Sequence, residues 1–396
     1  MELLDRIRER QQALTAWRHH IHAHPELAYE EKATSDFVAE KLERFGLEVH
    51  RGLGVTGVVG TLRAGSSGRA IGLRADMDAL PIQELNEFDH RSRHEGCMHA
   101  CGHDGHTTML LGAAEHLAAN RDFDGVVHFI FQPAEEGRAG AKAMIDDGLF
   151  ELFPVESVYG MHNWPGLPIG EFAVRVGPQM AASDKFEITV RGRGGHAAMP
   201  HQTIDPVVTA AHVITALQSL ASRNTEPTDS VVVSVTVLRG GETFNVIPDE
   251  VVLKGTARTL TPESRDRIER DIERVAAGVA EGFGATAETT YYRTYPPTVN
   301  TPDEAEIAAR AAAAVAGAGN VHRDLPPTMG GEDFAFMLQE KPGCYLWLGN
   351  GPGEGGCMLH NARYDFNDEA LPIGVAYWVS LVGELLGGSD RAPGAA

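Results

Sequence analysis

The sequence contains little cysteine, a deficit of positive charge and no long apolar run. Four cysteines among 396 residues are too few for a disulfide framework in a chain of this length: Cys97, Cys101, Cys344 and Cys357. The first ten residues are charged throughout and lack the apolar stretch of a signal peptide. These shortages lead us to expect a cytoplasmic protein.

Acidic residues outnumber basic ones, 55 to 34, which gives a formal net charge of −21. Such a surface repels phosphate backbones and anionic lipid, so we expect neither nucleic acid nor a membrane as partner. No stretch reaches the roughly 18 consecutive apolar residues of a membrane span. Hydrophobic residues make up 43% of the chain, enough to form a core, and the length predicts about two domains.

Helical and strand patterns alternate in both terminal parts of the chain. Helical spacing covers residues 3–22, 30–45, 105–119, 139–148, 302–316 and 369–386. Short apolar runs predict strands at 58–62, 70–74, 126–131, 155–159 and 344–348. Strands that alternate with helices indicate an α/β fold with a mostly parallel, buried sheet.

The middle of the chain has a different order of elements. It reads β-α-β-β-α-β, with strands at 185–191, 230–238, 251–259 and 286–294 and helices at 205–222 and 262–283. This is the split βαβ order of ferredoxin-like α+β domains. We therefore predict one α/β domain made of residues 1–183 and 297–396, interrupted by a smaller α+β domain at 184–296.

One glycine-rich segment, Gly52-Leu53-Gly54-Val55-Thr56-Gly57, matches the dinucleotide-binding pattern G-x-G-x-x-G. That binding mode needs a helix directly after the glycines, so that the helix N-terminus meets the pyrophosphate. The residues that follow, VVGTL, are typical of a strand. We therefore favour a glycine-rich hairpin over a nucleotide site.

The densest group of metal-binding residue types is H-A-C-G-H-D-G-H, at residues 99–106, where a helix is predicted to begin. Cysteine and histidine together suit a borderline cation such as zinc, manganese, cobalt or nickel. Cys101 and His103 are two residues apart, so an extended or turn backbone lets both side chains point the same way. A surface loop that happens to contain histidines is the weaker alternative.

Other polar residues follow the ends of predicted strands, where ligands bind in parallel sheets. Glu135 and Glu136 come after the strand at 126–131, His162 follows the strand at 155–159, and His360 follows a glycine-rich loop. Adjacent glutamates suit a division of roles, in which one binds a cation and the other accepts a proton from water. Taken singly, two acids in a loop or a lone histidine would be ordinary surface residues.

Together these segments supply five candidate ligands: Cys101, His103, Glu136, His162 and His360. One catalytic zinc needs only three protein ligands, whereas two cations about 3.5–4 Å apart would use all five. Asp76 and Asp78 follow the strand at 70–74 and could orient a liganding histidine. The mixed ligand set favours a catalytic site over a closed structural one.

These residues lie in motifs that occur in a fixed order along the chain: RHHIHAHPEL, GLRADMDALPIQE, MHACGHDGHT, FQPAEEG, GMHNWPGLPIG, GRGGHAAMPH, NVIPD, GGEDFAF and LHNARYDFND. The chain thereby resembles the metal-dependent aminoacylase/carboxypeptidase superfamily, in its hippurate hydrolase and auxin-conjugate amidohydrolase branch. The resemblance extends from residue 18 to residue 368. It implies a zinc-peptidase-like catalytic domain with an inserted lid and dimerisation domain.

The resemblance also implies roles for individual residues. The five candidate ligands would hold two divalent ions (zinc, manganese, cobalt or nickel), and Glu135 would be the general base. Cys101 stands where the wider superfamily has a carboxylate that bridges the metals. Asp78 resembles the superfamily's acid that supports a metal ligand without binding the metal itself. The role of Asp76 stays open.

In the inserted domain, His196 matches a histidine that in relatives binds the developing oxyanion, often in the partner subunit's site. This implies a homodimer or homotetramer formed through the inserted domain. Asn245 and Arg258 resemble groups that hold the substrate's carboxylate, which a guanidinium binds in bidentate fashion. A charge on a strand surface is an equal alternative for Arg258. Gly330 and Gly331 could line the same pocket with backbone donors.

The activity implied by the resemblance is hydrolysis of an N-acyl-L-amino acid, hippurate-like or N-acetylated, to a carboxylic acid and a free amino acid. An N-acetyl-diaminopimelate-type deacetylase and a dipeptidase are the alternatives within the enzymes. A metal-binding relative without catalysis is the alternative from another class. The paired Glu135 and Glu136 argue against this last alternative, because a binding protein needs no spare base.

Overall fold

The computed structural model describes residues 3–352 and 357–387. Within these residues the chain forms two compact units, each with its own apolar core. The larger unit comprises Met1–Gln179, Val299–Pro326 and Phe336–Ala396, and the smaller comprises Met180–Thr298 and Pro327–Ala335. Residues 327–335, which the sequence pattern assigned to the first domain, group with the smaller unit.

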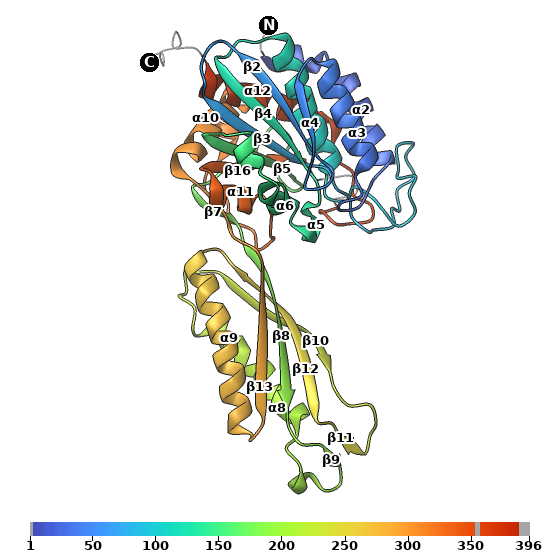
Figure 1. Cartoon of the computed structure of the whole chain (residues 1–396), viewed down its shortest axis with the longest axis vertical. Coiled ribbons are helices and arrows are strands. Elements are labelled where there is room, and N and C mark those ends of the chain that lie inside the picture. The colour runs from blue at the N-terminus through green and yellow to red at the C-terminus, as the bar shows by residue number, and fades with distance from the viewer. Residues whose placement is uncertain (1–2, 353–356, 388–396) are drawn as a thin grey trace. The chain divides into compact units, whose positions relative to one another are not determined.

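Eight strands form the sheet of the larger unit: β1 (Glu48–Leu53), β2 (Gly57–Ala64), β3 (Ala70–Asp76), β4 (Gly125–Gln132), β5 (Ser157–Trp164), β6 (Phe172–Ala173), β15 (Val321–His322) and β16 (Gly343–Gly349). Their order is β1-β2-β4-β3-β5-β16-β6-β15 (Figure 1). The central strands β4, β3, β5 and β16 run parallel, while β1 and β2 add antiparallel strands at one end. All residues of these four central strands except Trp164, at the end of β5, are buried, as both faces of a parallel sheet require. The prediction of an α/β fold with a mainly parallel sheet is confirmed.

The helices of this part of the chain are α1 (Leu3–Arg8), α2 (Gln11–Ala23), α3 (Lys32–Arg44), α4 (His103–Ala119), α5 (Glu135–Arg138), α6 (Gly140–Asp146), α7 (Leu149–Leu152), α10 (Pro302–Ala316), α11 (Ala335–Glu340) and α12 (Leu371–Leu386). By length and composition alone, residues 368–386 could cross a membrane, but 72% of that stretch is buried inside the protein. α12 contacts α2, α4 and α10. It is a core helix of the larger unit.

Two local expectations had different outcomes. The single helix expected at residues 3–22 is wrong, since α1 and α2 are separated at Glu9 and Arg10. Arg10 directly precedes α2, and its side chain binds Glu115 of α4, with Nη2 2.7 Å from Oε1. The glycine-rich hairpin is confirmed: β1 and β2 pair antiparallel, with Leu53 opposite Gly57.

The smaller unit contains strands β8 (Ala182–Arg191), β9 (Gly195–His196), β10 (Val231–Arg239), β11 (Val246–Ile247), β12 (Glu250–Thr259) and β13 (Thr286–Tyr295), with helices α8 (Pro206–Ser222) and α9 (Pro262–Gly282). Its main sheet has the order β10-β12-β8-β13, and every neighbouring pair is antiparallel. Both helices lie on one face of this sheet (Figure 1) and contact each other. Asp205 and Thr261 cap the two helices, because their side chains accept the first free backbone N–H groups. This is the ferredoxin-like arrangement expected from the order of elements.

A buried ion pair holds strand β8 to helix α9. Arg265 donates from Nε and Nη2 to the two carboxylate oxygens of Asp184, at 2.8 and 2.6 Å. Tyr291 and the backbone of Thr294 also donate to this carboxylate, at 3.0 Å each. Asp184 is 1% exposed, so its hydrogen-bonding capacity is met entirely inside the unit.

Replacing Arg265 with leucine should therefore leave the Asp184 carboxylate buried without its cation. We expect the smaller unit to lose about 3–5 kcal/mol of unfolding free energy, measured by urea denaturation of the full chain. Arg191→Gln is the control, because the ion pair of Arg191 with Glu288 is exposed to solvent. This substitution should leave the urea unfolding transition almost unchanged. Equal effects of the two substitutions would contradict the importance of the buried pair.

Candidate metal centre

The candidate ligands lie at the ends of neighbouring strands in the larger unit. β3 ends at Asp76, β4 ends just before the two glutamates, and His162 lies near the end of β5. These three strands are adjacent and parallel, so their carboxyl ends meet at one edge of the sheet. Gly102, which leads into α4, has φ +91°, and a Cβ there would lie 2.4 Å from Asn163 Oδ1. Only glycine therefore allows this close approach of the α4 start to β5.

Two groups of ligand atoms share the thiol of Cys101. His103 and His162 complete one group, and Glu136 and His360 complete the other; within each group the ligand atoms lie within 4.8 Å of one another. One sulfur thus belongs to two neighbouring three-ligand sets. A pair of divalent cations fits this arrangement, because a thiolate can bridge two borderline metals.

The orientation of His103 is suited to a cation. Its Nδ1–H donates to Asp78 Oδ1 at 3.2 Å, and the imidazole is buried. Its Nε2 is also buried but makes no hydrogen bond, and the nearest oxygen of Asp76 is 3.8 Å away. A buried polar nitrogen without a partner is costly, and a liganding histidine characteristically anchors its other nitrogen to a carboxylate. The residues present therefore fit a metal ion.

The other two histidines reach the thiol and the glutamate. His162 donates from Nδ1 to the carbonyl of Asn163 at 2.7 Å, which leaves Nε2 3.4 Å from Cys101 Sγ. His360 has a left-handed backbone, with φ +63°, and its Nε2 lies 3.3 Å from Glu136 Oε1. Such a backbone conformation is unfavourable for a residue with a side chain, and it is often retained at functional sites.

Asp76, whose role the sequence left open, lies behind the ligands in a buried charge network. It accepts from His106 Nδ1 at 2.6 Å and from Arg74 Nη1 at 2.7 Å. His106 also faces Asn163 Oδ1 at 2.6 Å. Sequence reasoning missed His106 and Arg74: the histidine was quoted only as part of its motif, and an arginine in an apolar strand carries no separate signal.

Asp78 holds the two glutamates in place through hydrogen bonds from their backbone N–H groups. Asp78 accepts from the N–H of Glu135 at 3.0 Å and from the N–H of Glu136 at 2.9 Å. Glu135 is buried, and its carboxylate lies within 4.8 Å of ligand atoms of His103 and Glu136. One buried aspartate therefore orients both a candidate ligand and the proposed base.

The protonation states follow from burial and from the neighbouring carboxylates. Burial, with Glu136 and Glu135 nearby, raises the pKa of the Cys101 thiol well above its usual value. Burial opposes protonation of His103, but Asp76 and Asp78 outweigh it and raise the pKa of this imidazole to about 10. Burial lowers the pKa of His162 well below its usual value. Without cations, the thiol and His103 therefore both carry protons at pH 7.

Metal binding should consequently release protons. Both raised pKa values belong to groups that must lose a proton to become ligands, so metal affinity should rise with pH above 7. Calorimetry of zinc binding at pH 7, in buffers of different ionisation enthalpy, should detect release of close to two protons per protein. A binding enthalpy that is independent of the buffer would contradict this description of the site.

The remaining candidate residues lie in the smaller unit. His196 pairs with Val246 on the β9–β11 ribbon, and the carbonyl of Asn245 accepts from Ala197 N–H at 3.0 Å. His196 and Asn245 are therefore neighbours, and both are exposed.

Ser183 of β8 joins two further candidates in this unit. Arg258 donates to Ser183 Oγ, and a Cβ at Gly331 would lie 2.8 Å from Ser183 Cβ. The structure thus brings Arg258 and Gly331 to one side chain. The carbonyl of Gly330 accepts from the N–H of Ala181, at 2.9 Å.

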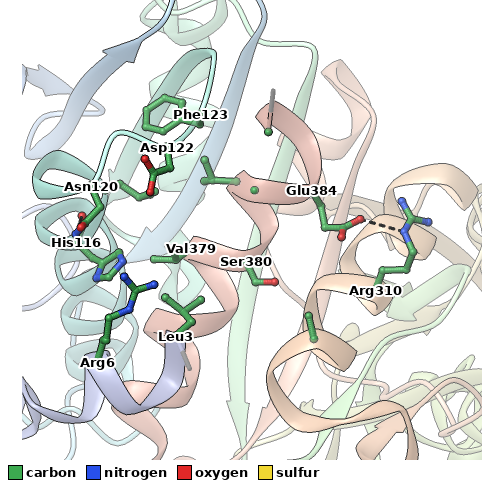
Figure 2. A pocket seen from close by; sticks show the side chains of 15 residues that line it. Leu3, Arg6, His116, Asn120, Asp122, Phe123, Arg310, Val379, Ser380 and Glu384 are labelled. Carbon is green, nitrogen blue, oxygen red and sulfur yellow. Dashed lines mark hydrogen bonds and ion pairs between the residues drawn. The ribbon is translucent and has the colours of Figure 1, made fainter. Parts of the chain in front are cut away.

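A separate cavity of about 750 Å³ lies among α1, α4, α10 and α12 of the larger unit (Figure 2). Arg310 and Glu384 form an ion pair at its wall, with Nε 3.1 Å from Oε2. His116 also lines it, but none of the candidate metal ligands does. This cavity is therefore not part of the candidate metal centre at the strand ends.

Comparison with known families gives a match to peptidase family M20/M25/M40 over residues 72–384. The matched segment covers most of the chain. It begins within β3 and ends within α12, so it includes every candidate ligand.

Individual relatives match over nearly the full length. A hippurate hydrolase from Campylobacter jejuni is 42% identical over 381 residues, which cover 96% of this chain and 98% of that protein. An N-acetylcysteine deacetylase from Bacillus subtilis is 40% identical over 370 residues, covering 92% and 94%. The crystal structure of the Bacillus subtilis YXEP protein, a dinuclear metal-binding peptidase of the M20 family, is similar with a TM-score of 0.84 and 35% identity, covering 96% and 99%.

Proposed function

Because the chain belongs to peptidase family M20/M25/M40, we propose that it is a metal-dependent amidohydrolase of N-acyl-L-amino acids. It converts a hippurate-like or N-acetylated amino acid into a carboxylic acid and a free amino acid. A relative named hippurate hydrolase and one named N-acetylcysteine deacetylase, each at least 40% identical, support this substrate class.

The observation that carries the proposal is the pair of ligand groups that share Cys101 beside a buried glutamate. A protein that only binds metal has no need for Glu135, which is buried next to the ligands without being required to complete either group. A buried carboxylate beside a cation site is the arrangement that general base catalysis on water requires. This favours an enzyme over a metal-binding protein without catalysis.

Divalent cations held by Cys101, His103, Glu136, His162 and His360 would acidify a bound water and polarise the amide carbonyl. Glu135 accepts a proton from the water as its oxygen attacks the carbonyl carbon, and then delivers that proton to the leaving nitrogen when the C–N bond breaks. Asp78 keeps Glu135 in place through the backbone N–H bond and keeps His103 in the tautomer that exposes Nε2. His196 stabilises the oxyanion that forms on the carbonyl oxygen.

The smaller unit would bind the amino-acid part of the substrate. Arg258 is partly buried and makes no ion pair among the described residues of its unit, and burial lowers the pKa of its guanidinium. A substrate carboxylate would provide the missing anionic partner. Gly330 and Gly331 are proposed to add backbone contacts to the same carboxylate. Asn245 lies beside His196, at the other end of β12 from Arg258, so it is proposed to contact the substrate carboxylate in the other copy's site.

A substrate panel tests the proposal most directly. Hippurate, N-acetyl-methionine, N-acetyl-diaminopimelate, indoleacetyl-alanine and a dipeptide would be assayed with manganese, zinc, cobalt and nickel. We expect hydrolysis of hippurate or N-acetyl-methionine above that of the dipeptide. Metal binding without hydrolysis of any compound would overturn the proposal, and preference for N-acetyl-diaminopimelate or the dipeptide would favour those alternatives.

We also propose that a second copy of the chain completes the active site, in a homodimer or homotetramer formed through the smaller unit. Exposed apolar side chains lie on and just before the β9–β11 ribbon that carries His196: Val246 of β11 is 50% exposed, and Phe244, two residues earlier, is fully exposed. Among the residues that the structure describes, β10 is an edge strand with one unpaired side. Exposed apolar residues and an open edge are typical of a surface that another protein covers.

Mixing two inactive variants tests this assembly. Glu135→Gln lacks the base and His196→Ala lacks the oxyanion donor, so each homodimer should be inactive. If His196 acts on the other copy's site, random mixing should restore about a quarter of wild-type activity, because half the dimers then have one complete site. A monomeric protein, or no recovery after proven subunit exchange, would contradict the proposal.

A further inference from the structure

Glu31 is a buried acid that lies outside both ligand groups. It stands at the start of α3 and is 0% exposed. Its Oε1 accepts from the backbone N–H of Ala134 at 2.8 Å, and its Oε2 accepts from Thr56 Oγ1 at 2.7 Å. Both carboxylate oxygens are therefore engaged inside the larger unit, one of them by the residue directly before Glu135.

The segment 134–136 presents three consecutive backbone N–H groups to two buried carboxylates. Ala134 donates to Glu31, while Glu135 and Glu136 donate to Asp78. Ala134 adopts a left-handed backbone with φ +55°, which costs energy for a residue with a side chain. The hydrogen bond to Glu31 compensates this conformation, because without it the amide would be buried and unpaired.

The same N-terminal segment holds the far end of this loop. Tyr29 donates from its hydroxyl to the carbonyl of Arg138 at 2.8 Å. Residues 29 and 31 thus bind the loop on both sides of the two glutamates. The position of Glu135 depends on contacts from a part of the chain more than a hundred residues away in sequence.

The glycine-rich hairpin supplies the other partner of Glu31. Thr56 follows Gly54 and Val55, which both have left-handed backbones, with φ +58° and +77°. A Cβ at Gly54 would lie 2.9 Å from Met144 Cγ of α6, so the turn packs closely against the helix after the glutamates. This packing holds the Thr56 hydroxyl against Glu31. The glycine-rich motif therefore has a structural role, which is to shape the turn that positions Thr56.

We propose that Glu31 is a positioning residue for Glu135: it locks the left-handed turn at Ala134, and with it the direction of the catalytic carboxylate. The assignment rests on the proposed function, in which Glu135 is the general base. Displacement of a catalytic group by about 1 Å can cost on the order of a hundredfold in rate, so a lost backbone anchor should be visible in kcat.

Glutamine should replace Glu31 well. Burial, with Asp78 nearby, raises the pKa of Glu31 to about 7 despite the hydrogen bond from Thr56, so the neutral form is accessible in the folded protein. A glutamine oxygen can accept from Ala134 N–H, and its amide can donate to the Thr56 hydroxyl, which accepts as well as donates. Methionine has a similar length but offers no oxygen to either partner.

The experiment compares Glu31→Met, Glu31→Gln and the control Glu30→Met, whose target is the exposed neighbouring acid. We expect kcat to fall roughly 10- to 100-fold in Glu31→Met, with KM within about threefold and two metals bound, and we expect near wild-type kcat in Glu31→Gln and Glu30→Met. In metal-free protein, amide hydrogen exchange in a peptide covering residues 131–138 should accelerate in Glu31→Met alone. All assays are made at a temperature at which each variant is folded by calorimetry.

Two results would overturn the inference. One is wild-type kcat together with wild-type exchange in Glu31→Met. The other is a Glu31→Gln variant as defective as Glu31→Met, since the oxygen facing Ala134 would then not be the relevant feature. If the wild-type protein hydrolyses no substrate, the proposed function fails, while the exchange measurement still tests the hold of Glu31 on the loop.

Discussion

Replacing Glu135 with glutamine should reduce kcat by about 10²- to 10⁴-fold while both metal ions stay bound. Glutamine is nearly the same size, and its backbone N–H can still donate to Asp78, so the loop should keep its shape. The amide cannot accept a proton from water or pass one to the leaving nitrogen. The loss should therefore appear in kcat far more than in KM.

Metal analysis decides whether this loss is chemical. The variant should contain two metal equivalents per chain, because Glu135 completes neither of the two groups that share Cys101. The exposed acid Glu30, changed to glutamine, serves as the control for the loss of one negative charge. Retained turnover in Glu135→Gln would refute the role of general base, and loss of metal would make Glu135 a ligand instead.

Much of the fold follows from patterns that are local in sequence. The continuous apolar run at 126–131 predicted β4, which is buried on both faces. The alternation of apolar and polar residues at 185–191 predicted β8, which is buried on one face only. The expected helix at 3–22 was wrong at its middle, where Arg10 binds Glu115 of α4. That contact joins residues far apart in sequence, and no local propensity reports it.

The candidate site was predictable in its residue types but not in its supporting contacts. Cysteine, histidine and paired glutamates stand out by chemistry, so Cys101, His103 and Glu136 could be selected from their motifs. Glu31 could not, because a glutamate at the start of a helix is expected from the helix dipole alone. Its hydrogen bond to Ala134 exists only after the chain folds. Glu31 therefore required the structure, whereas Asp76 and Asp78 could be expected from their place after the strand at 70–74.

Replacing Cys101 with alanine should disturb both cation sites at once, since its thiol is the one ligand that the two groups share. We expect metal content to fall below one equivalent per chain and activity to fall more than about a thousandfold, because cation binding contributes several kcal/mol to the reaction. Cys97→Ala is the matched control: Cys97 is also a buried free thiol but belongs to neither group. Its metal content should be that of the wild type.

Cys101→Asp separates the bridging role from the choice of metal. A carboxylate can bridge two cations but is a harder ligand than a thiolate, so this variant should bind two metals and favour manganese over zinc relative to wild type. With cobalt, the sulfur-to-metal absorption of the wild type should disappear in both Cys101 variants and persist in Cys97→Ala. If Cys101→Ala instead keeps two tightly bound metals, the sulfur is not a shared ligand. The two cations would then need another bridge, and the proximity of Glu136 and His360 to the thiol would be a matter of packing alone.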